Sequence, residues 1–238
     1  MSAPDKPTES VGLLMALPAE AHSVGVPGLH PGDCVRWRHG WVAVSGIGPR
    51  NARHAAERLL ACGASRLANW GVAGALRPDL AAGDVLVPER IRCAPGDPGF
   101  ATDADACERL IAALSAGLNV HRGVLWSARQ PVSTQAEKKA LAESSGAVAV
   151  DMEAASIAAV AARANIPFVA VKAICDPVTR ELPARILGAL DGADGGFSLR
   201  MLSAIAFGGP TAWRAAHALA RDFARARHSL TAAAALAA

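Results

Sequence analysis

The sequence predicts an α/β fold: a single domain built as a three-layer sandwich, with helices on both faces of a mostly parallel, mixed central sheet. Short apolar runs of strand length alternate along the chain with alanine-rich segments of helical length, which is the pattern of such folds. Residues 145–176 also form a strand–helix–strand unit, and connections of that length join parallel strands by a right-handed crossover. The domain is expected over residues 11–230, between tails at 1–10 and 231–238.

Local signals place each element in turn. Strands are expected at residues 11–16, 41–45, 66–72, 83–87, 122–126, 145–150 and 168–174. Helices are expected at residues 49–62, 105–116, 135–144, 151–164, 198–207 and 211–229. Pro49 suits a first helical turn, and Gly146 leads into a short buried strand. Asp151 opens the next helix, which residues 165–167 (Asn-Ile-Pro) then end.

The composition is that of an ordinary globular protein. At 238 residues and 52% hydrophobic content the chain can bury a sizeable core. No run approaches the ~18 uninterrupted apolar residues of a membrane span, and a net charge of +3 is too small to indicate a nucleic-acid partner. The five cysteines and seven histidines show no metal-ligand or disulfide spacing, so we expect no metal and a reducing, cytoplasmic location.

Two carboxylates stand where the crossover can bring them together. Glu153 lies in the first turn of the helix that begins at Asp151, and Asp176 follows the strand 168–174. About 13 helical residues at 1.5 Å and about 6 strand residues at 3.3 Å both span roughly 20 Å, so the two ends return to one sheet edge. Ligands bind at the carboxyl edge of such sheets, which makes Glu153 and Asp176 candidate catalytic residues. The alternative is that Asp151 and Glu153 only cap the helix.

A glycine turn follows the strand 41–45. Gly46 and Gly48 are typical of a turn whose backbone N–H groups bind phosphate at the start of a helix. A dinucleotide fingerprint would need a third glycine where this chain has Asn51, and no acidic residue ends a second strand at the required distance. The turn is therefore a weak indication of phosphate, and a nicotinamide-dependent dehydrogenase is a distant alternative.

The motifs are more specific in combination than alone. In order they are Gly12…Glu20, Ser45-Gly46-Ile47-Gly48, Asn69-x-Gly71-x-Ala73-Gly74, Gly83-Asp84-Val85-Leu86-Val87, Val150-Asp151-Met152-Glu153-Ala154 and Ile174-Cys175-Asp176. Over residues 11–176 this order resembles the purine nucleoside phosphorylase superfamily, and its closest branch looks like the 5′-methylthioadenosine/S-adenosylhomocysteine nucleosidases. The segment 176–183 (Asp-Pro-Val-Thr-Arg-Glu-Leu-Pro) is similar to the hopanoid-associated phosphorylases, which remove adenine from adenosylhopane.

The resemblance implies an enzyme that cleaves the N-glycosidic bond of a 5′-substituted adenosine and releases adenine. Asp176 would donate a hydrogen bond or a proton to N7 of the purine. Glu153 would stay ionised, accept the ribose hydroxyls and stabilise positive charge on the sugar. Met152 would pack against the sugar.

Further family positions imply the residues that line the substrate. Those expected at the nucleoside are Pro131, Val132, Gly71, Val72, Ala73, Gly74 and Phe197. Those expected at a phosphate are Gly46, Gly48, Arg50 and Asn69. The aromatic residue that commonly stacks on adenine near Pro131 is missing, so Trp126 or Phe197 would have to replace it.

The residues leave the attacking nucleophile open. Glu20 aligns with the glutamate that activates water in the nucleosidases, which favours hydrolysis. A phosphorylase needs cations and amides around a phosphate dianion. Arg50, Arg53 or Lys172 would have to supply the cations, because the arginine and serine of some phosphorylases are replaced by Asn69 and Val72. The hopanoid-like segment favours phosphate as co-substrate, so we expect phosphorolysis of adenosylhopane without a cofactor. Hydrolysis of methylthioadenosine or S-adenosylhomocysteine is the alternative.

The C-terminal part of the chain adds expectations about partners. The segment 177–197 is long for a connection, and its apolar residues suit an oily 5′ substituent. The last helix carries arginines beside apolar residues, and we expect it to pack on the sheet, with peripheral contact to a membrane surface as the alternative. The resemblance implies a homo-oligomer that binds a small-molecule nucleoside. A non-catalytic lipid- or nucleoside-binding module is the alternative function.

Overall fold

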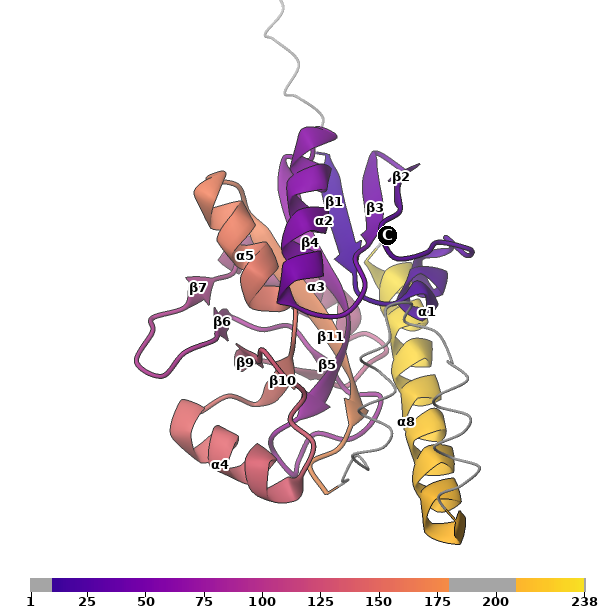
Figure 1. The fold of residues 1–238 in the computed structure, drawn as a ribbon. Helices are drawn as coiled ribbons and strands as arrows, with labels where there is room; N and C mark the ends of the chain where they lie inside the picture. The colour runs from indigo at the N-terminus through magenta and orange to yellow at the C-terminus, as the bar shows by residue number, and fades with distance from the viewer. Residues whose placement is uncertain (1–9, 180–208, 238) are drawn as a thin grey trace, which may run out of the picture.

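The computed structural model describes residues 10–179 and 209–237, and its ribbon shows a central β-sheet with helices packed against it (Figure 1). The strands of the described residues are β1 (Val11–Met15), β2 (Cys34–Trp37), β3 (Gly40–Val44), β4 (Arg66–Ala75), β5 (Val85–Leu86), β6 (Arg90–Arg92), β7 (Phe100–Ala101), β8 (Val120–His121), β9 (Val124–Ser127), β10 (Ala149–Asp151) and β11 (Phe168–Asp176). The helices are α1 (Pro18–Ala21), the 3-10 turn η1 (His22–Val24), α2 (Pro49–Ala61), α3 (Ala104–Leu114), α4 (Gln135–Ser145), α5 (Ala154–Arg163) and α8 (Gly209–Leu236).

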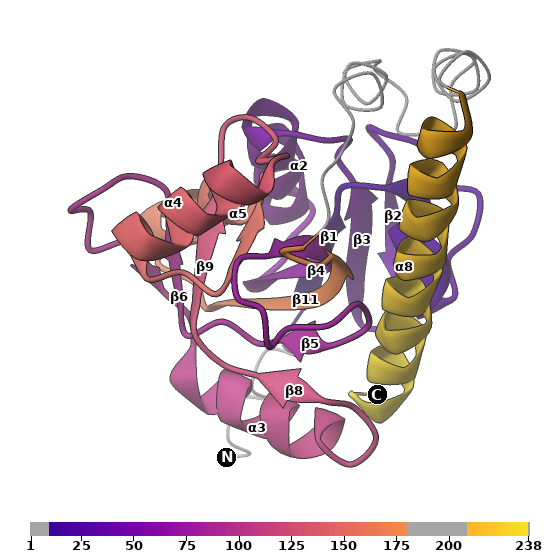
Figure 2. The same cartoon turned by 90° about the horizontal axis from the view of Figure 1, so that it is seen from below.

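Two apolar clusters, one on each face of the sheet, make the sandwich. α2 and α5 lie side by side on one face, where Leu59 is fully buried. α3, α8 and the α1–η1 turn cover the other face, where Leu230 is fully buried. Successive residues of a strand point to opposite faces, and β11 accordingly sends Ile174 into the first cluster and Ala173 into the second. The predicted three-layer α/β domain is confirmed (Figure 2).

The parallel part of the sheet brings the predicted motifs together. β1 pairs with β3 and with β4, and β11 pairs with β4, all in parallel. Glu20 follows β1, the Gly46–Gly48 turn follows β3, and Asp176 ends β11. Because parallel strands end at the same edge of a sheet, these residues and the last residues of β4 lie at one end of the domain.

The strands on either side of α5 are not the parallel neighbours that the sequence predicted. β10 pairs antiparallel with the end of β4, where Val150 lies opposite Gly74, whereas β11 runs parallel to β4 and places Asp176 opposite the same glycine. β10 and β11 therefore flank β4 on its two sides. An apolar strand pattern carries no information on direction, and β4 has ten residues, enough to pair with β1 first and with β10 at its end.

Several element boundaries also differ from the prediction. Asp151 is the last residue of β10, and α5 begins only at Ala154, with Glu153 as its N-cap. The strand predicted at residues 122–126 begins only at Val124, as β9, because Gly123 separates it from β8 with a φ of +140°, a conformation that side chains disfavour. A Cβ at Gly123 would lie 2.9 Å from Val148 Cγ1, so glycine at this position also allows Val148 to pack here.

The last helix packs onto the sheet, as expected. α8 lies against β11 and η1, and Ala226, Leu230 and Ala233 are fully buried in the second cluster. It continues through residues 231–236, which the sequence had assigned to a tail, because its buried stripe continues to Ala233. Among the described helices, none is both long and apolar enough to cross a membrane. The predicted helix at 198–207 and most of the segment 177–197 lie outside the described residues.

Candidate active site

Glu20 is a buried carboxylate held by backbone N–H groups from two elements. It is only 2% exposed in α1, directly after β1. Its Oε2 accepts hydrogen bonds of 2.9 Å from the N–H groups of Ala16 and Leu17, and its Oε1 accepts one of 2.9 Å from the N–H of Val72 in β4. Burial raises the pKa of Glu20, and the positive charge of Lys172 and these hydrogen bonds oppose the rise. The Glu20 carboxylate is thereby fixed between the segment that follows β1 and strand β4.

The glycines of β4 make room for the carboxylates on either side. A Cβ at Gly71 would lie 2.5 Å from Glu20 Oε1, so only glycine allows the carboxylate to approach this strand. Gly74, three residues later, faces Asp176, whose Oδ2 would lie 3.5 Å from a Cβ there. The predicted segment Gly71–Gly74 therefore runs from Glu20 to Asp176, with Val72 and Ala73 between them.

Glu153 does not cap its own helix. Although it occupies the N-cap position of α5, its side chain makes no capping bond, and Oδ2 of Asp151 instead accepts the Ala154 N–H at 3.0 Å. The Glu153 carboxylate turns to the glycine turn, where Oε1 accepts a 2.7 Å hydrogen bond from the Gly48 N–H and Oε2 accepts one of 3.3 Å from Met152. The capping alternative thus applies to Asp151 and leaves Glu153 for another task.

Lys172 supplies the positive charge for this group of carboxylates. It is 2% exposed in the centre of β11, and its Nζ lies 2.8 Å from Oδ2 of Asp151. Burial alone would lower the pKa of Lys172, but the charges of Asp151, Glu153 and Glu20 raise it above its usual value. From the sequence, Lys172 was a candidate only for binding phosphate. A lysine within an apolar strand was the available signal, since such a residue needs an anionic partner when buried.

The same groups set the charge state of Glu153. Burial and the neighbouring Asp151 carboxylate raise the pKa of Glu153 to about 7, against the opposing influence of Lys172 and the Gly48 hydrogen bond. Among the described residues, three buried carboxylates thus surround the ammonium of Lys172. Within the described residues, no group of three or more His, Cys, Asp or Glu side chains could hold a metal ion.

Asp176 forms a second, separate charge pair. A register shift between Ile174 and Asp176 interrupts the pairing of β11 with β4 just before this carboxylate, and such irregularities redirect side chains next to functional sites. Oδ2 of Asp176 lies 2.7 Å from Nζ of Lys138 in α4, and both side chains are buried. Lys138 was not predicted as a site residue, because nothing in the sequence pattern of α4 distinguishes it from the adjacent Lys139.

The two predicted catalytic carboxylates therefore flank one strand end, and within residues 10–179 Glu153 is held by Gly48 and Asp176 by Lys138. Val150 and Asp176 lie opposite Gly74 on the two sides of β4, and Glu153 follows Val150 by three residues. Two strand spacings of about 4.8 Å separate β10 from β11 by roughly 10 Å. Glu153 and Asp176 are thus brought to one edge, as expected, although β4 and not a simple crossover brings them there.

The other predicted residues fall into three groups. Asn69 is buried and donates from Nδ2 to the Leu14 carbonyl at 3.3 Å, while Arg50 is exposed at the start of α2. Pro131 is exposed and Val132 is half-buried against the small cluster that also contains the buried Trp126. The residues outside the described part include Phe197.

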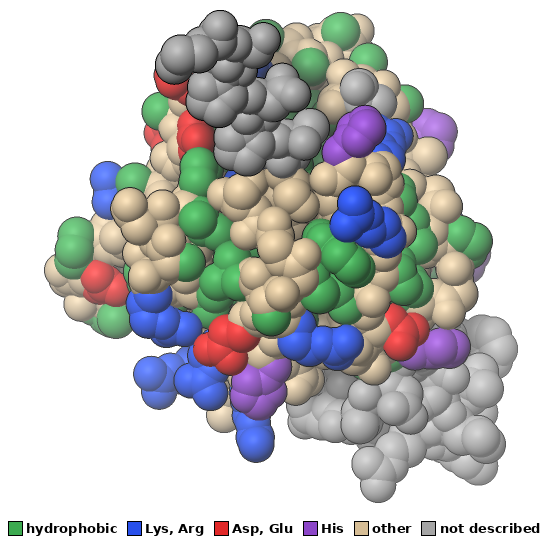
Figure 3. Space-filling view, turned by 90° about the horizontal axis from the view of Figure 1, so that it is seen from above, with side chains coloured by type: hydrophobic (Ala, Val, Ile, Leu, Met, Phe, Trp, Pro, Cys, Tyr) green, Lys and Arg blue, Asp and Glu red, His purple; other side chains and the backbone are tan. Residues whose placement is uncertain are grey.

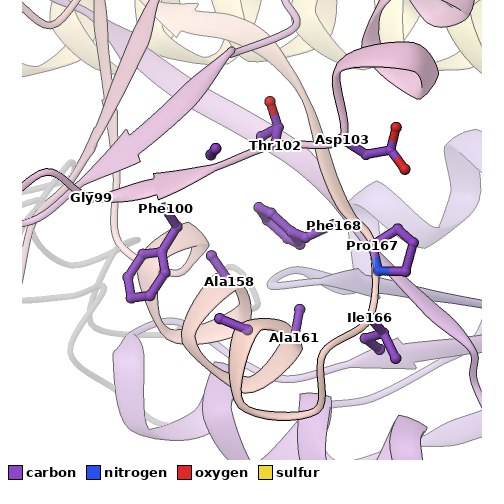
Figure 4. Close-up of a pocket in the computed structure, with 11 residues that line it drawn as sticks. Gly99, Phe100, Thr102, Asp103, Ala158, Ala161, Ile166, Pro167 and Phe168 are labelled. Carbon is purple, nitrogen blue, oxygen red and sulfur yellow. The ribbon is translucent and has the colours of Figure 1, made fainter.

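Two hollows in the described part of the chain lie away from these carboxylates. A pocket of about 430 Å³ lies between Phe100, Ala161 and Phe168 at the far ends of α5 and β11 (Figure 4), and its Asp103 caps α3 through the Ala106 N–H. A second hollow, of about 620 Å³, lies at the amino ends of β1, β4 and β11. The surface at that end carries hydrophobic side chains bordered by Lys and Arg (Figure 3). Neither pocket contains a carboxylate pair.

Comparisons with known proteins bear on the family and the fold. Residues 30–190 match the model of the family described as the phosphorylase superfamily. A 5′-methylthioadenosine/S-adenosyl homocysteine nucleosidase of Helicobacter pylori is 18% identical, with a TM-score of 0.68 over 96% of this chain and 98% of that one. The corresponding nucleosidase of Neisseria meningitidis is 20% identical, with a TM-score of 0.68 over 95% and 97% of the two chains. A futalosine hydrolase mutant of Helicobacter pylori is 22% identical, with a TM-score of 0.61 over 70% and 89%.

Proposed function

The chain belongs to the phosphorylase superfamily, and on that premise we propose that it is an enzyme that cleaves the N-glycosidic bond of a 5′-substituted adenosine and releases adenine. Breaking this bond builds positive charge on the ribose and negative charge on the departing purine. The observation that carries the proposal is the position of Glu153, a buried carboxylate that does not cap its own helix and is held instead by the Gly48 N–H. Buried ionisable groups with a perturbed pKa are common at functional sites, and the pKa of Glu153 is raised to about 7.

Glu153 is suited to the sugar side of the bond. Its Oε1 is fixed by the Gly48 N–H, so the carboxylate is oriented before the substrate arrives. When ionised, it accepts hydrogen bonds from ribose hydroxyls and stabilises the positive charge that develops at C1′. Half-buried Met152, the residue before it, offers an apolar contact for the ribose.

Asp176 is suited to the purine side. It lies across β4 from Glu153, at a separation that a ribose and the adjoining part of a purine can fill. A carboxyl group at this point can bind N7 and the exocyclic amine of adenine, and N7 is the atom that must gain a proton or a hydrogen bond as the base leaves. The two carboxyl groups then act on opposite sides of the same bond.

The charges around Glu20 favour water as the attacking nucleophile. Among the described residues, Glu20, Asp151 and Glu153 surround the ammonium of Lys172, so a phosphate dianion would meet more carboxylates than cations there. The Gly48 N–H, expected to bind phosphate, is already bonded to Glu153. Glu20 can accept a proton from water, and its raised pKa brings it closer to the range in which a general base works.

Phosphorolysis of adenosylhopane is the second candidate. Arg50 lies exposed in the first turn of α2, where a helix N-terminus attracts anions. The hopanoid-like segment 176–183 supports the same substrate, although only its first four residues lie within the described part.

The test is an assay of both products. Purified protein is incubated with 5′-methylthioadenosine and with adenosylhopane, each with and without inorganic phosphate, and adenine and sugar are separated by chromatography. Adenine with a free ribose product, independent of phosphate, supports hydrolysis. A ribose 1-phosphate product that requires phosphate supports the second candidate. Tight binding of either nucleoside without adenine release would instead support a non-catalytic binding module and refute both.

A further inference from the structure

Lys138 is a fully buried lysine whose charge is directed at a predicted catalytic residue. Its Nζ lies 2.7 Å from Oδ2 of Asp176 and 3.2 Å from the carbonyl oxygen of Pro177. Its neighbour Lys139 is 76% exposed and only approaches Glu143 at 4.0 Å. Because a buried ammonium is costly to desolvate, its retention beside one carboxylate calls for an explanation beyond stability.

The helix does not need this lysine for its own formation. α4 begins with a capping box in which Thr134 accepts the Glu137 N–H and Glu137 accepts the Thr134 N–H. A further hydrogen bond, 2.6 Å from Gln135 Nε2 to the Thr179 carbonyl, fastens the start of α4 to the chain after β11. α4 is therefore already placed against this segment, and Lys138 adds a charge to it at one atom of Asp176.

We propose that Lys138 is a positioning residue that acts through Asp176, fixing this carboxyl group by Oδ2 and balancing the negative charge of the purine side as adenine leaves. The inference rests on the proposed function. As the C1′–N9 bond breaks, its electron pair passes to the purine, and N7 takes a proton from the Asp176 carboxyl group. The ammonium then stabilises the carboxylate that this proton transfer leaves behind. Without the Lys138 ammonium, the negative charge formed on Asp176 would be uncompensated in a buried site, which is unfavourable because charges interact strongly there.

This role predicts an effect that depends on the leaving group. 5′-Methylthioadenosine needs its purine protonated, whereas the 4-nitrophenyl glycoside of 5-methylthioribose releases a stable anion without a proton. Lys138→Met should lower kcat for methylthioadenosine about 100-fold or more, the scale of a lost acid catalyst, and change nitrophenolate release by no more than about threefold. Lys138→Arg should recover part of the methylthioadenosine rate, because it restores the charge. Lys139→Met is the matched control and should alter neither rate.

A double variant keeps the test independent of folding defects caused by an unpaired carboxylate. Asp176→Asn combined with Lys138→Met should be no slower than Asp176→Asn alone, because Lys138 acts only through Asp176. If the rate losses of the two single variants multiply in the double variant, the proposal is overturned. It is also overturned if Lys138→Met slows the turnover of both substrates equally. Turnover of the two substrates by the unaltered protein tests the proposed function itself, and the ratio of their rates among variants tests Lys138.

Discussion

The backbone N–H of Gly48 donates a 2.7 Å hydrogen bond to Oε1 of Glu153, across 105 positions of the chain. This bond joins the turn after β3 to the start of α5, two elements that meet only because the sheet brings both to one edge. Burial alone favours the neutral form of Glu153. The hydrogen bond from Gly48 and the positive charge of Lys172 favour the ionised form. The site is thus built to present a charge whose protonation changes near neutral pH.

The rate should therefore depend on pH through Glu153. Only the ionised carboxylate stabilises positive charge on the ribose, and the pKa of Glu153 is about 7. We expect kcat/KM for adenine release to fall about tenfold for each pH unit below that value, since this ratio reports groups of the free enzyme. Measurement in constant-ionic-strength buffers from pH 5 to 9 checks it. A profile that stays flat from pH 8 to 5 would exclude Glu153 as the required anion.

The same residue should reduce stability at high pH. Its pKa is about 7 in the folded protein against a usual value of 4.5, so between these values the folded state binds more protons than the unfolded state. Stability contributed by this group is therefore present at pH 4.5 and lost as the pH rises to 7. Glu153→Gln should raise the free energy of unfolding in urea at pH 8, by up to about 3 kcal/mol, and change it little at pH 5. Glu143→Gln, at a side chain that is 68% exposed, is the control. A Glu153→Gln protein less stable than the unaltered protein at pH 8 would contradict the account.

Gly71→Ala should disturb Glu20. The new Cβ would lie 2.5 Å from Glu20 Oε1, and three backbone hydrogen bonds prevent this carboxylate from moving aside. Overpacking of this kind costs about 1–3 kcal/mol of stability, and we expect the rate of adenine release to fall about tenfold or more with the displaced base. Gly117→Ala is the matched control, because its Cβ would have Leu236 Cδ1 at 3.5 Å as its nearest neighbour. Unchanged kinetics in Gly71→Ala would mean that the position of Glu20 does not matter.

Lys172→Met should leave three buried carboxylates without their cation. Removing one partner of a buried ion pair costs about 3–5 kcal/mol, and we expect a loss of this size in urea unfolding at pH 8. The decrease in the free energy of unfolding should be smaller at pH 5, where Glu153 is protonated. Lys139→Met should be close to neutral at both pH values, because that side chain is exposed. An equal loss at pH 5 and pH 8 would indicate that Lys172 contributes by packing and not by charge.

The sequence predicted the sheet-edge location of Glu20, Gly48, Glu153 and Asp176 because each follows a strand whose apolar pattern is clear. It did not predict how the strands pair, since direction depends on tertiary contacts that a local pattern does not record. β10 was expected to run parallel to β11, yet it pairs antiparallel with β4 at Gly74. The prediction of a shared edge held because β4 separates the two strands by only its own width.

The charge partners were the harder part to predict. Lys138 and Lys139 are identical neighbours on one helix, and only the way α4 packs decides that the first is buried and the second exposed. Glu153 looked like a helix cap because carboxylates are common at that position. Its true partner, Gly48, lies beyond any local pattern.

Our proposal is that Glu153 and Asp176 together break the bond between ribose and adenine. Its most direct test is chromatographic measurement of adenine released from 5′-methylthioadenosine by the unaltered protein, by Glu153→Gln and by Asp176→Asn, with the fold of each variant checked by thermal unfolding. We predict steady release by the unaltered protein and rates at least about 100-fold lower in both folded variants, the scale of a lost electrostatic or acid catalyst. Release by either folded variant at the rate of the unaltered protein would contradict the claim.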